Sequence, residues 1–409
     1  MSYLHTHWRD LDAWKGEGLP LTTTSNEAAK MYDATVTQHT GWYDEPSVGG
    51  IEGSLSKMIT ADPDFVMGHV LSCGLDLISS GVGIHVDHAL KQRMETLESL
   101  ANKSNISYRE RLHAKAVKQW AEGYLQGMYA FGLVETGFYS EAEKHALKAL
   151  QLNPKDCWST HAEAHVLEMQ GRQDDGISFL SKTIDNWTMG AMLACHNYWH
   201  WAVYHIEKGE HQAALDIFDE EVGKRCHSGA MLDLVDASSL LYRLQMEGVD
   251  VASRWKELFH LWESHTDDHI LVFNDVHMLM CTLGAKNEDA TLKLLGSIRD
   301  FIRDGSGTNW EISKDVGLTI CEAFERADKG KFDNAVEILK PARYKVVTIG
   351  GSNAQRDLFN LFLIHAALNS PKKQHHQLAR SLLTERKAKK NSAPMTDRLM
   401  AQALALHAE

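Results

Sequence analysis

Helical periodicity is the feature that most constrains what this 409-residue chain can fold into. Apolar residues recur at spacings of three and four, and glycine or polar turns interrupt them about every 12 to 18 residues. The chain contains only 7 prolines, and no segment keeps the alternation of apolar and polar residues that is typical of a strand. The pattern therefore predicts an all-α protein.

The pattern also predicts where the helices lie. Two of them have a capping box at the start, at Thr24 to Glu27 and at Ser352 to Gln355. From Tyr108 to Val134 there is neither a proline nor a clear cap, which predicts either one long helix or a kink at a glycine. The other ranges are 27–40, 51–61, 65–78, 87–101, 140–151, 159–169, 175–185, 195–207, 212–222, 232–245, 252–264, 270–283, 290–304, 316–327, 333–349, 353–368, 374–389 and 396–407.

Small and turn residues repeat with a period of about 34 residues, which is typical of a tetratricopeptide unit. Degenerate copies open at Cys157, where Gly176 replaces the usual alanine, and again at Cys195 and Val316. Small residues let helices approach closely, and stacked hairpins share one core. We therefore predict a right-handed solenoid of antiparallel helix hairpins, with an irregular bundle as the alternative. The first window, 123–156, places six residues at the expected offsets: Ala130, Gly137, Tyr139, Ala142, Ala149 and Pro154.

We expect one continuous solenoid with three parts. Residues 1–122 would form amino-terminal helical hairpins, 123–230 the central tetratricopeptide repeats, and 231–409 degenerate repeats and capping helices.

Charge and composition restrict the partners. The chain has 42 basic and 55 acidic side chains, a net charge of -13, which argues against binding to nucleic acid or to an anionic membrane. The chain has no run of 18 apolar residues, so membrane insertion is not predicted. The 6 cysteines form no C-x-x-C pair, and the amino terminus has no apolar signal segment, so we predict a reduced, cytoplasmic protein. The association state of the chain stays open.

Histidines gather in two neighbouring windows. Successive helical residues advance by about 100 degrees, so His161, His165 and Glu168 share one face of their helix. His196 and His200 form a second pair four residues apart. In tetratricopeptide proteins the matching positions of the first helix line a concave groove. We predict that one hollow receives His161, His165, Glu168, His196, Trp199 and His200.

Three uses of this hollow remain open. The four histidines could bind zinc or another first-row metal, although no cofactor is otherwise predicted. They could instead hold a peptide or a small polar ligand, or simply pack the inner wall. A zinc protease mechanism is disfavoured, because Glu163 points away from the first pair and Asn197 occupies the general-base position of the second.

A second polar cluster lies downstream and includes Asn274, His277 and Arg356 as candidate ligand-binding residues. Gly350 and Gly351 precede a capped helix start, where amide hydrogens could face an anion. Arg356 and Asp357 could equally form structural ion pairs. We interpret the basic run from 387 to 390, near Arg380 and Arg386, as a solvated helix end.

Segments outside the repeat positions resemble the tetratricopeptide repeat protein 38 family. The resemblance covers nearly the whole chain and implies a cytosolic, tetratricopeptide-like solenoid without implying a particular activity. Members of that family carry an additional helical stretch between segments resembling 109–123 and 124–133, which are fused here; a shortened isoform or an incomplete gene model would explain the fusion. The similar segments are LTTTSNEAAKMYDAT (21–35), GGIEGSLSK (49–57), DPDFVMGH (62–69), MLACHNYWHWA (192–202), SLLYRLQMEG (239–248), HILVFND (269–275) and GGSNAQRDLF (350–359).

Together these patterns predict a non-catalytic repeat protein that binds a peptide, a protein or a small polar ligand in its concave groove. The alternative is an enzyme with a histidine-lined pocket, with or without an assisting metal. The side chains would then be used for acid and base chemistry.

Overall fold

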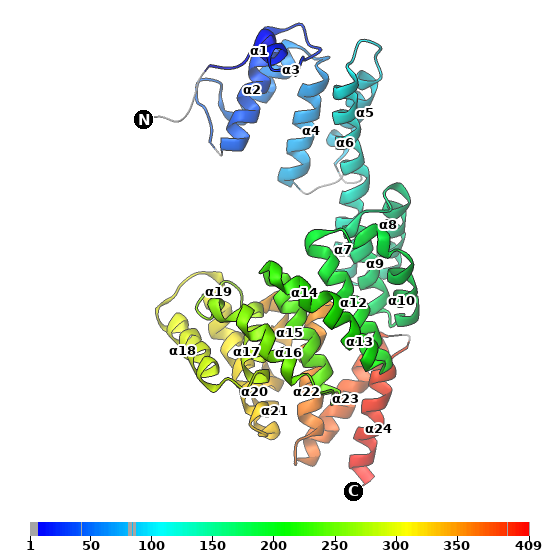
Figure 1. Cartoon of the computed structure of the whole chain (residues 1–409), viewed down its shortest axis with the longest axis vertical. Coiled ribbons are helices and arrows are strands. Elements are labelled where there is room, and N and C mark those ends of the chain that lie inside the picture. Colours follow the sequence, from blue (N-terminus) through cyan, green and yellow to red (C-terminus); the bar gives the residue numbers. More distant parts are fainter. Residues whose placement is uncertain (1–6, 42, 81–83, 85–86, 391, 409) are drawn as a thin grey trace. The chain divides into compact units, whose positions relative to one another are not determined.

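The computed structural model describes residues 7–41, 43–80, 84, 87–390 and 392–408. Every regular element in these residues is a helix (Figure 1), which confirms the all-α prediction. The chain divides into two compact units, Met1–Tyr129 with Lys148–Asn153, and Ala130–Leu147 with Pro154–Glu409. None of the helices in the described part of the chain is long and apolar enough to span a bilayer.

The first unit packs two groups of helices around one core. Helix α2 pairs with α3, while α4, α5 and α6 contact one another. Met58, Phe65, Leu90 and Leu97 are among the buried core residues. The helix bounds are α1 (Leu11–Gly16), α2 (Asn26–Gly41), α3 (Gly50–Ala61), α4 (Val66–Ser80), α5 (His88–Ala101) and α6 (Tyr108–Gln119).

The helix that follows runs through the fused segment without a break. Helix α6 continues into a π-helical turn, Trp120–Tyr124, and then into α7 (Leu125–Glu135). Gly123 lies inside that widened turn. The prediction was either one long helix or a kink at a glycine. The structure has a continuous helix whose geometry changes around Gly123.

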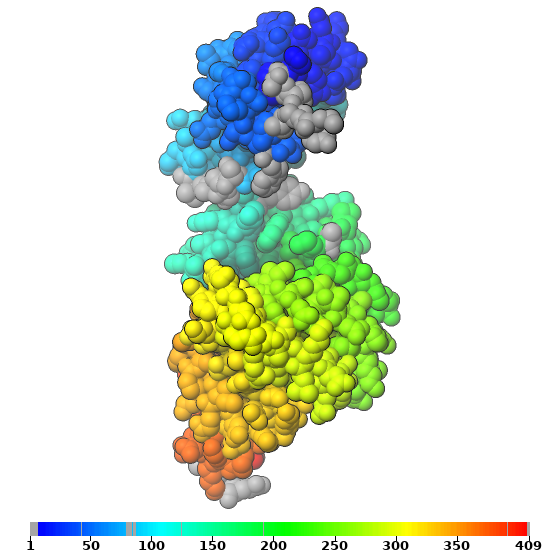
Figure 2. Space-filling view, turned by 90° about the vertical axis from the view of Figure 1, so that its left-hand side faces the viewer, coloured from blue at the N-terminus to red at the C-terminus, as the bar shows by residue number. Residues whose placement is uncertain are grey.

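The second unit holds the remaining helices, with α7 and α8 each divided between the units. Figure 2 shows the face of this unit that carries α18 and α19 in yellow, next to α20 and α21. The bounds are α8 (Tyr139–Leu152), α9 (Cys157–Met169), α10 (Gln173–Lys182), α11 (Ile184–Trp187), α12 (Ala191–Lys208), α13 (His211–Ile217), α14 (Gly223–Arg225), α15 (Met231–Met246), α16 (Ala252–Trp262), α17 (Val272–Gly284), α18 (Glu288–Asp304), α19 (Thr308–Ile312), α20 (Leu318–Asp328), α21 (Phe332–Ala342), α22 (Asn353–Leu368), α23 (Lys373–Lys389) and α24 (Pro394–Ala408).

One turn recurs between the helices of successive pairs. After α9, for example, the Gly171 amide bonds the Glu168 carbonyl at 3.0 Å and the next amide, of Arg172, bonds the Leu167 carbonyl at 2.8 Å. This is the hydrogen-bond pattern of a Schellman C-cap, which needs a residue in the left-handed conformation. The same two bonds and the same positive φ recur at Gly137, Gly209, Gly248, Lys286 and Gly330.

Helix α22 occupies the centre of the second unit. It contacts α9, α15, α21, α23 and α24. Phe359 of α22 also meets Phe273 of α17 and Phe324 of α20, with ring centroids 6.3 and 6.1 Å apart. Its sequence is apolar on nearly all sides and most of its residues are buried, as expected for a helix surrounded by others.

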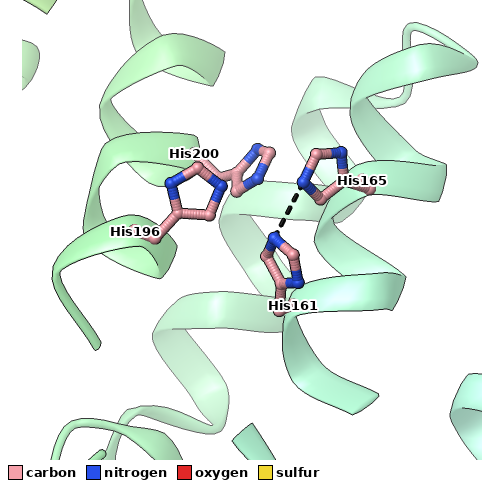
Figure 3. A group of neighbouring side chains, drawn as sticks. All are labelled: His161, His165, His196 and His200. Carbon is pink, nitrogen blue, oxygen red and sulfur yellow. Dashed lines mark hydrogen bonds between the residues drawn. The ribbon is translucent and has the colours of Figure 1, made fainter. Parts of the chain in front are cut away.

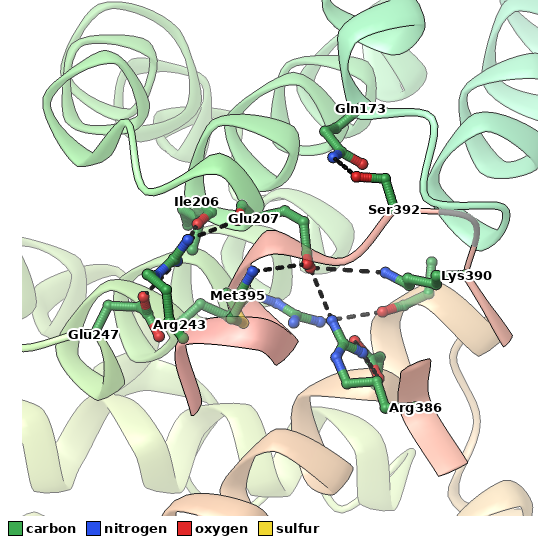
Figure 4. Close-up of polar contacts among 12 residues, drawn as sticks. Gln173, Ile206, Glu207, Arg243, Glu247, Arg386, Lys390, Ser392 and Met395 are labelled. Atoms are coloured by element: carbon green, nitrogen blue, oxygen red, sulfur yellow. Dashed lines mark hydrogen bonds and ion pairs between the residues drawn. The ribbon is translucent and has the colours of Figure 1, made fainter. Parts of the chain in front are cut away.

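The carboxyl-terminal segment is fastened to α12 by a buried ionic network around Glu207 (Figure 4). The Arg386 guanidinium lies 2.9 Å from the Glu207 carboxylate, and the Met395 amide donates to the same carboxylate at 3.2 Å. Gln173 donates to Ser392 at 3.1 Å, which ties the α23–α24 connection to α10.

The two predicted capping boxes have different outcomes. The box at Ser352 and Gln355 is present and starts α22. The first box is wrong, because the Ser25 hydroxyl, not that of Thr24, accepts the Ala28 amide at 3.1 Å and so caps α2. A box that the sequence analysis did not identify joins Ser107 and Glu110 at the start of α6.

Candidate functional site

Helices α9 and α12 bring the two predicted histidine pairs together (Figure 3). One ring nitrogen from each of His161, His165, His196 and His200 lies within 4.8 Å of the others. The four side chains are 0–4% exposed. The helical spacing thus identified the residues that meet.

Local capping and one cross-helix bond hold the two helices in register. The Asp156 carboxylate accepts the Trp158 amide at 3.0 Å and so caps α9 just before its histidines. The Tyr204 hydroxyl of α12 donates to the Ala164 carbonyl of α9 at 2.6 Å. Because Ala164 lies between the two histidines of α9, this bond sets the distance between the pairs.

Two of the imidazoles are oriented by buried carboxylates. His200 Nδ1 lies 2.6 Å from Glu168 Oε2, and His196 Nδ1 lies 2.8 Å from Asp236 Oδ2 of α15. An ionised carboxylate only accepts hydrogen bonds, so each Nδ1 carries the proton and each Nε2 keeps a free lone pair. Asp236, which the sequence analysis missed, belongs to this site.

The other two imidazoles bond each other. His165 Nε2 lies 2.8 Å from His161 Nε2 (Figure 3). The buried Nδ1 atoms of both rings, and Nε2 of His200, have no hydrogen-bond partner among the described residues. Buried polar atoms without a partner are uncommon in folded proteins, so this cluster requires an explanation.

Burial keeps three of the four imidazoles neutral. Loss of hydration lowers the pKa of His161, His165 and His200 well below the usual value, and charge on neighbouring imidazoles acts in the same direction. Burial raises the pKa of the Glu168 carboxyl, while the nearby Lys390 and Arg243 oppose that rise. Neutral imidazole is the form that binds a metal ion.

Aromatic rings enclose the cluster. The Trp199 indole stacks on His196, with centroids 5.1 Å apart and an interplanar angle of 6°. The Phe131 ring lies 4.9 Å from His161 and 5.0 Å from His165. Trp199 is 0% exposed, so its indole offers no open face to a ligand.

The expected open groove is not formed by these side chains, because all six predicted residues are buried. The reason is α22, which packs against both α9 and α15. From α15, Arg243 donates to the Ala354 carbonyl of α22 at 3.1 Å. A carboxyl-terminal helix therefore fills the space that the repeat pattern assigned to a ligand.

The downstream candidates do not form one site. His277 is 0% exposed and its Nδ1 lies 2.7 Å from the Phe273 carbonyl, which accepts its proton. Asn274 lies on the same helix and, like His277, does not border the cavities described below. Arg356 alone of the three borders the large cavity.

The anion expected at the start of α22 is supplied by the chain itself. The Glu135 carboxylate accepts the Asn353 backbone amide at 3.0 Å, and the Arg356 guanidinium lies 3.4 Å from that carboxylate. Asp357 pairs with Arg386, not with Arg356. The ion pairs of this region therefore differ from those considered from the sequence.

Beside α22 and α23 lies a cavity of about 550 Å³. Tyr344 and Val347 at its edge are 78% and 61% exposed, so the cavity is open to solvent. A second, small cavity of about 10 Å³ borders Glu168, Glu207 and Arg243. The large cavity is lined by Tyr139, Glu168, Met169, Leu339, Arg343, Tyr344, Val346, Val347, Asn353, Arg356, Asp357, Phe359, Asn360, Ile364, Leu382, Glu385, Arg386, Lys389 and Lys390.

This lining corrects one part of the interpretation of the basic run at 387–390 as a solvated helix end: Lys387 and Lys389 are exposed as expected, but the Lys390 side chain is not. Arg386 is 8% exposed and the Lys390 side chain only 9%. Both border the cavity, as does the exposed Lys389. Their role could not be recognised from the sequence, because a run of charges gives no indication of which helix packs against it.

A search against protein-family models finds no match to this chain. The histidine cluster and the open cavity are therefore the two features from which a function can be inferred.

Proposed function

We propose that this chain is a cytoplasmic, tetratricopeptide-like repeat protein that binds an anionic ligand in the cavity beside α22 and α23. The repeated C-cap between paired helices supports the repeat architecture, since equivalent turns recur from Gly137 to Gly330. The resemblance to the tetratricopeptide repeat protein 38 family supports the same architecture. A right-handed solenoid whose inner side is filled by its last helices accounts for both.

The charge of the cavity lining carries the ligand assignment. Five basic side chains and three acidic ones border the cavity, an excess of two positive charges, in a chain whose net charge is -13. Lys389 has no ion-pair partner in the described part of the chain, and Arg343 pairs only with Glu385, which is itself exposed. These two cations are therefore the ones most available to a ligand.

The apolar lining limits the ligand further. Val346, Phe359, Ile364 and Leu382 line the same cavity as the cations. A volume of about 550 Å³ falls within the range of small-molecule sites. The ligand that fits has an apolar part and a carboxylate, as a small amphipathic acid or the end of an acidic peptide would.

A binding assay with matched lysine variants tests this proposal. The probe is a dye-labelled peptide of alternating Glu and Leu with a free terminal carboxylate, followed by fluorescence anisotropy, with decanoate as the competitor. Lys389→Glu should weaken binding about tenfold, or ~1.4 kcal/mol, because it replaces attraction by repulsion. Lys387→Glu is the control, since Lys387 lies on the same helix and pairs with Asp397 outside the cavity.

Three results would overturn the proposal. One is that neither the peptide nor decanoate binds at millimolar concentration. Another is that the two lysine variants weaken binding equally. The third is that binding does not depend on ionic strength, which would exclude a charged cavity as the site.

The alternative of an enzyme with a histidine-lined pocket has less support. None of the four clustered imidazoles borders either cavity described above, and only Glu168 is shared between the histidine cluster and the cavity. Acid and base chemistry on a bound ligand would need an imidazole that reaches it.

A further inference from the structure

We infer that His161, His165, His196 and His200 bind one first-row transition metal ion, of the zinc class, in a closed site that links α9 to α12. This inference goes beyond the proposed ligand binding and does not depend on it. It concerns the four imidazoles, none of which borders either cavity.

The distances fit a metal ion after a small adjustment. Zinc binds histidine nitrogen at about 2.0–2.1 Å in a tetrahedron, which places the nitrogens about 3.4 Å apart. In this structure the four donor atoms lie within 4.8 Å of one another, with the closest pair at 2.8 Å. Movements of about 1 Å, available through side-chain rotation, would convert the cluster to that geometry.

Two of the four rings also have the carboxylate partner that is usual for a metal-binding histidine. A histidine that binds a metal almost always donates its other ring hydrogen to a carboxylate, a carbonyl or water. Asp236 and Glu168 accept from Nδ1 of His196 and His200 at 2.8 and 2.6 Å. The lone pairs of both Nε2 atoms are thereby left available to an ion.

The hydrogen bonds within the cluster also favour a metal ion. A purely hydrogen-bonded cluster of four neutral imidazoles would pair its donors with its acceptors. Here only one bond forms within the cluster, and His200 Nε2 is buried without a partner. A metal ion would take up that lone pair, together with the Nε2 atoms of His161 and His165 once the proton of their single bond has moved to Nδ1 of the donor ring.

The ligand set selects the metal and its role. Four nitrogen donors at the corners of a tetrahedron suit zinc or cobalt better than Cu(II) or Ni(II), which favour planar arrangements. Four protein ligands leave no open position, which is the pattern of a structural site. The ion would join α9 to α12 directly, and through Asp236 to α15, whose Arg243 bonds α22.

The experiment uses full-length protein made without a histidine tag, in medium supplied with zinc and, separately, with cobalt. Elemental analysis should give about one metal ion per chain, and X-ray absorption should show a shell of nitrogen without sulfur at about 2.0–2.1 Å. The double variant His165→Gln/His200→Gln should lose the ion. The matched control is His277→Gln, another buried histidine with an unpartnered Nε2, which should retain it.

A second variant covers the case in which the double variant does not fold. Asp236→Asn keeps all four ligands and should weaken metal binding about 10- to 100-fold in a competition with a chelator, because only the orienting carboxylate is lost. A second control, His205→Gln/His211→Gln, removes partly exposed imidazoles that could bind metal adventitiously.

Wild-type protein without stoichiometric metal after growth in either medium would overturn the inference. So would metal retained by the folded double variant, or chelator competition unchanged by Asp236→Asn. None of these results bears on the anionic ligand, because no ligand is present in the experiment.

Discussion

At the scale of single residues, burial of a histidine makes stability depend on pH. Burial lowers the pKa of His277 to about 4, from an ordinary value of 6.5. Between pH 4 and pH 6.5 the imidazole is therefore mostly protonated in the unfolded chain and mostly neutral in the folded chain. The stabilisation is therefore complete above pH 6.5 and is lost as the pH falls towards 4.

Replacing His277 by Leu should flatten this part of the pH profile. We expect the difference in unfolding free energy between pH 7 and pH 4.5 to shrink by about 2–3 kcal/mol. Urea denaturation followed by tryptophan fluorescence at both pH values measures it. An unaltered slope in the Leu variant would show that His277 is not the buried base described here.

The same scale shows how far the sequence could define the histidine site. The i, i+4 spacing of each pair was sufficient to place both pairs on single helix faces, and consecutive repeats were sufficient to bring the faces together. Asp236 could not be found in this way, because it lies 40 residues beyond His196 on α15 and reaches the ring only through the packing of that helix. The depth of burial likewise depends on α22, which begins 192 residues after His161 and 153 residues after His200 (353 − 161 and 353 − 200).

At the scale of helices, the surroundings of Gly176 show why the proposed repeat that opens at Cys157 has glycine where alanine is usual. A Cβ at this position would lie 2.4 Å from the Tyr204 ring of α12. That ring cannot move away easily, because it is 1% exposed and its hydroxyl donates to the Ala164 carbonyl. The usual alanine is therefore excluded by the neighbouring helix.

Gly176→Ala should destabilise the protein by about 2 kcal/mol, because overpacking outweighs the better helix propensity of alanine. Thermal and urea denaturation measure this effect. Gly296→Ala is the control, since a Cβ there has no neighbour within 4 Å, and it should be neutral or mildly stabilising. If the clash is the cause, the Gly176→Ala penalty becomes smaller in a Tyr204→Leu background. An equal penalty in both backgrounds would contradict this explanation.

The helices themselves were largely predictable, whereas the spacing of the recurring turn between them was only partly so. The left-handed turn residues from Gly137 to Gly330 lie 34, 38, 39, 38 and 44 residues apart. A search at a fixed period of about 34 residues loses register at each longer unit. One of the longer connections contains the π-helical turn Phe218–Val222, which adds residues without a glycine or proline to mark them. Lys286 replaces glycine in one turn, which also hides that unit.

At the scale of the whole molecule, metal binding should act on the second unit alone. The inferred ion would join α9, α12 and, through Asp236, α15, all of which belong to that unit. Removing the metal with a chelator should therefore speed amide hydrogen exchange in these three helices. Exchange in α2 to α5 of the first unit should stay the same. Uniform acceleration in both units, or none in either, would contradict a local site.

The role of α22 could not be predicted, although its position in the sequence could. The pattern of residues 353–368 indicates a helix with apolar residues on most sides, and such a helix must be enclosed. Nothing in that pattern identifies the enclosing helices as α9, α15, α21, α23 and α24. We therefore expected an open groove in the place that α22 occupies. The open cavity lies instead beside this helix.

The most direct test of the account is crystallographic. Diffraction data from untagged, metal-supplemented protein, collected just above and just below the zinc absorption edge, locate the ion independently of any activity. The account predicts one anomalous peak between the Nε2 atoms of His161, His165, His196 and His200 that disappears below the edge. A map without that peak, with the four rings held by hydrogen bonds alone, would contradict it.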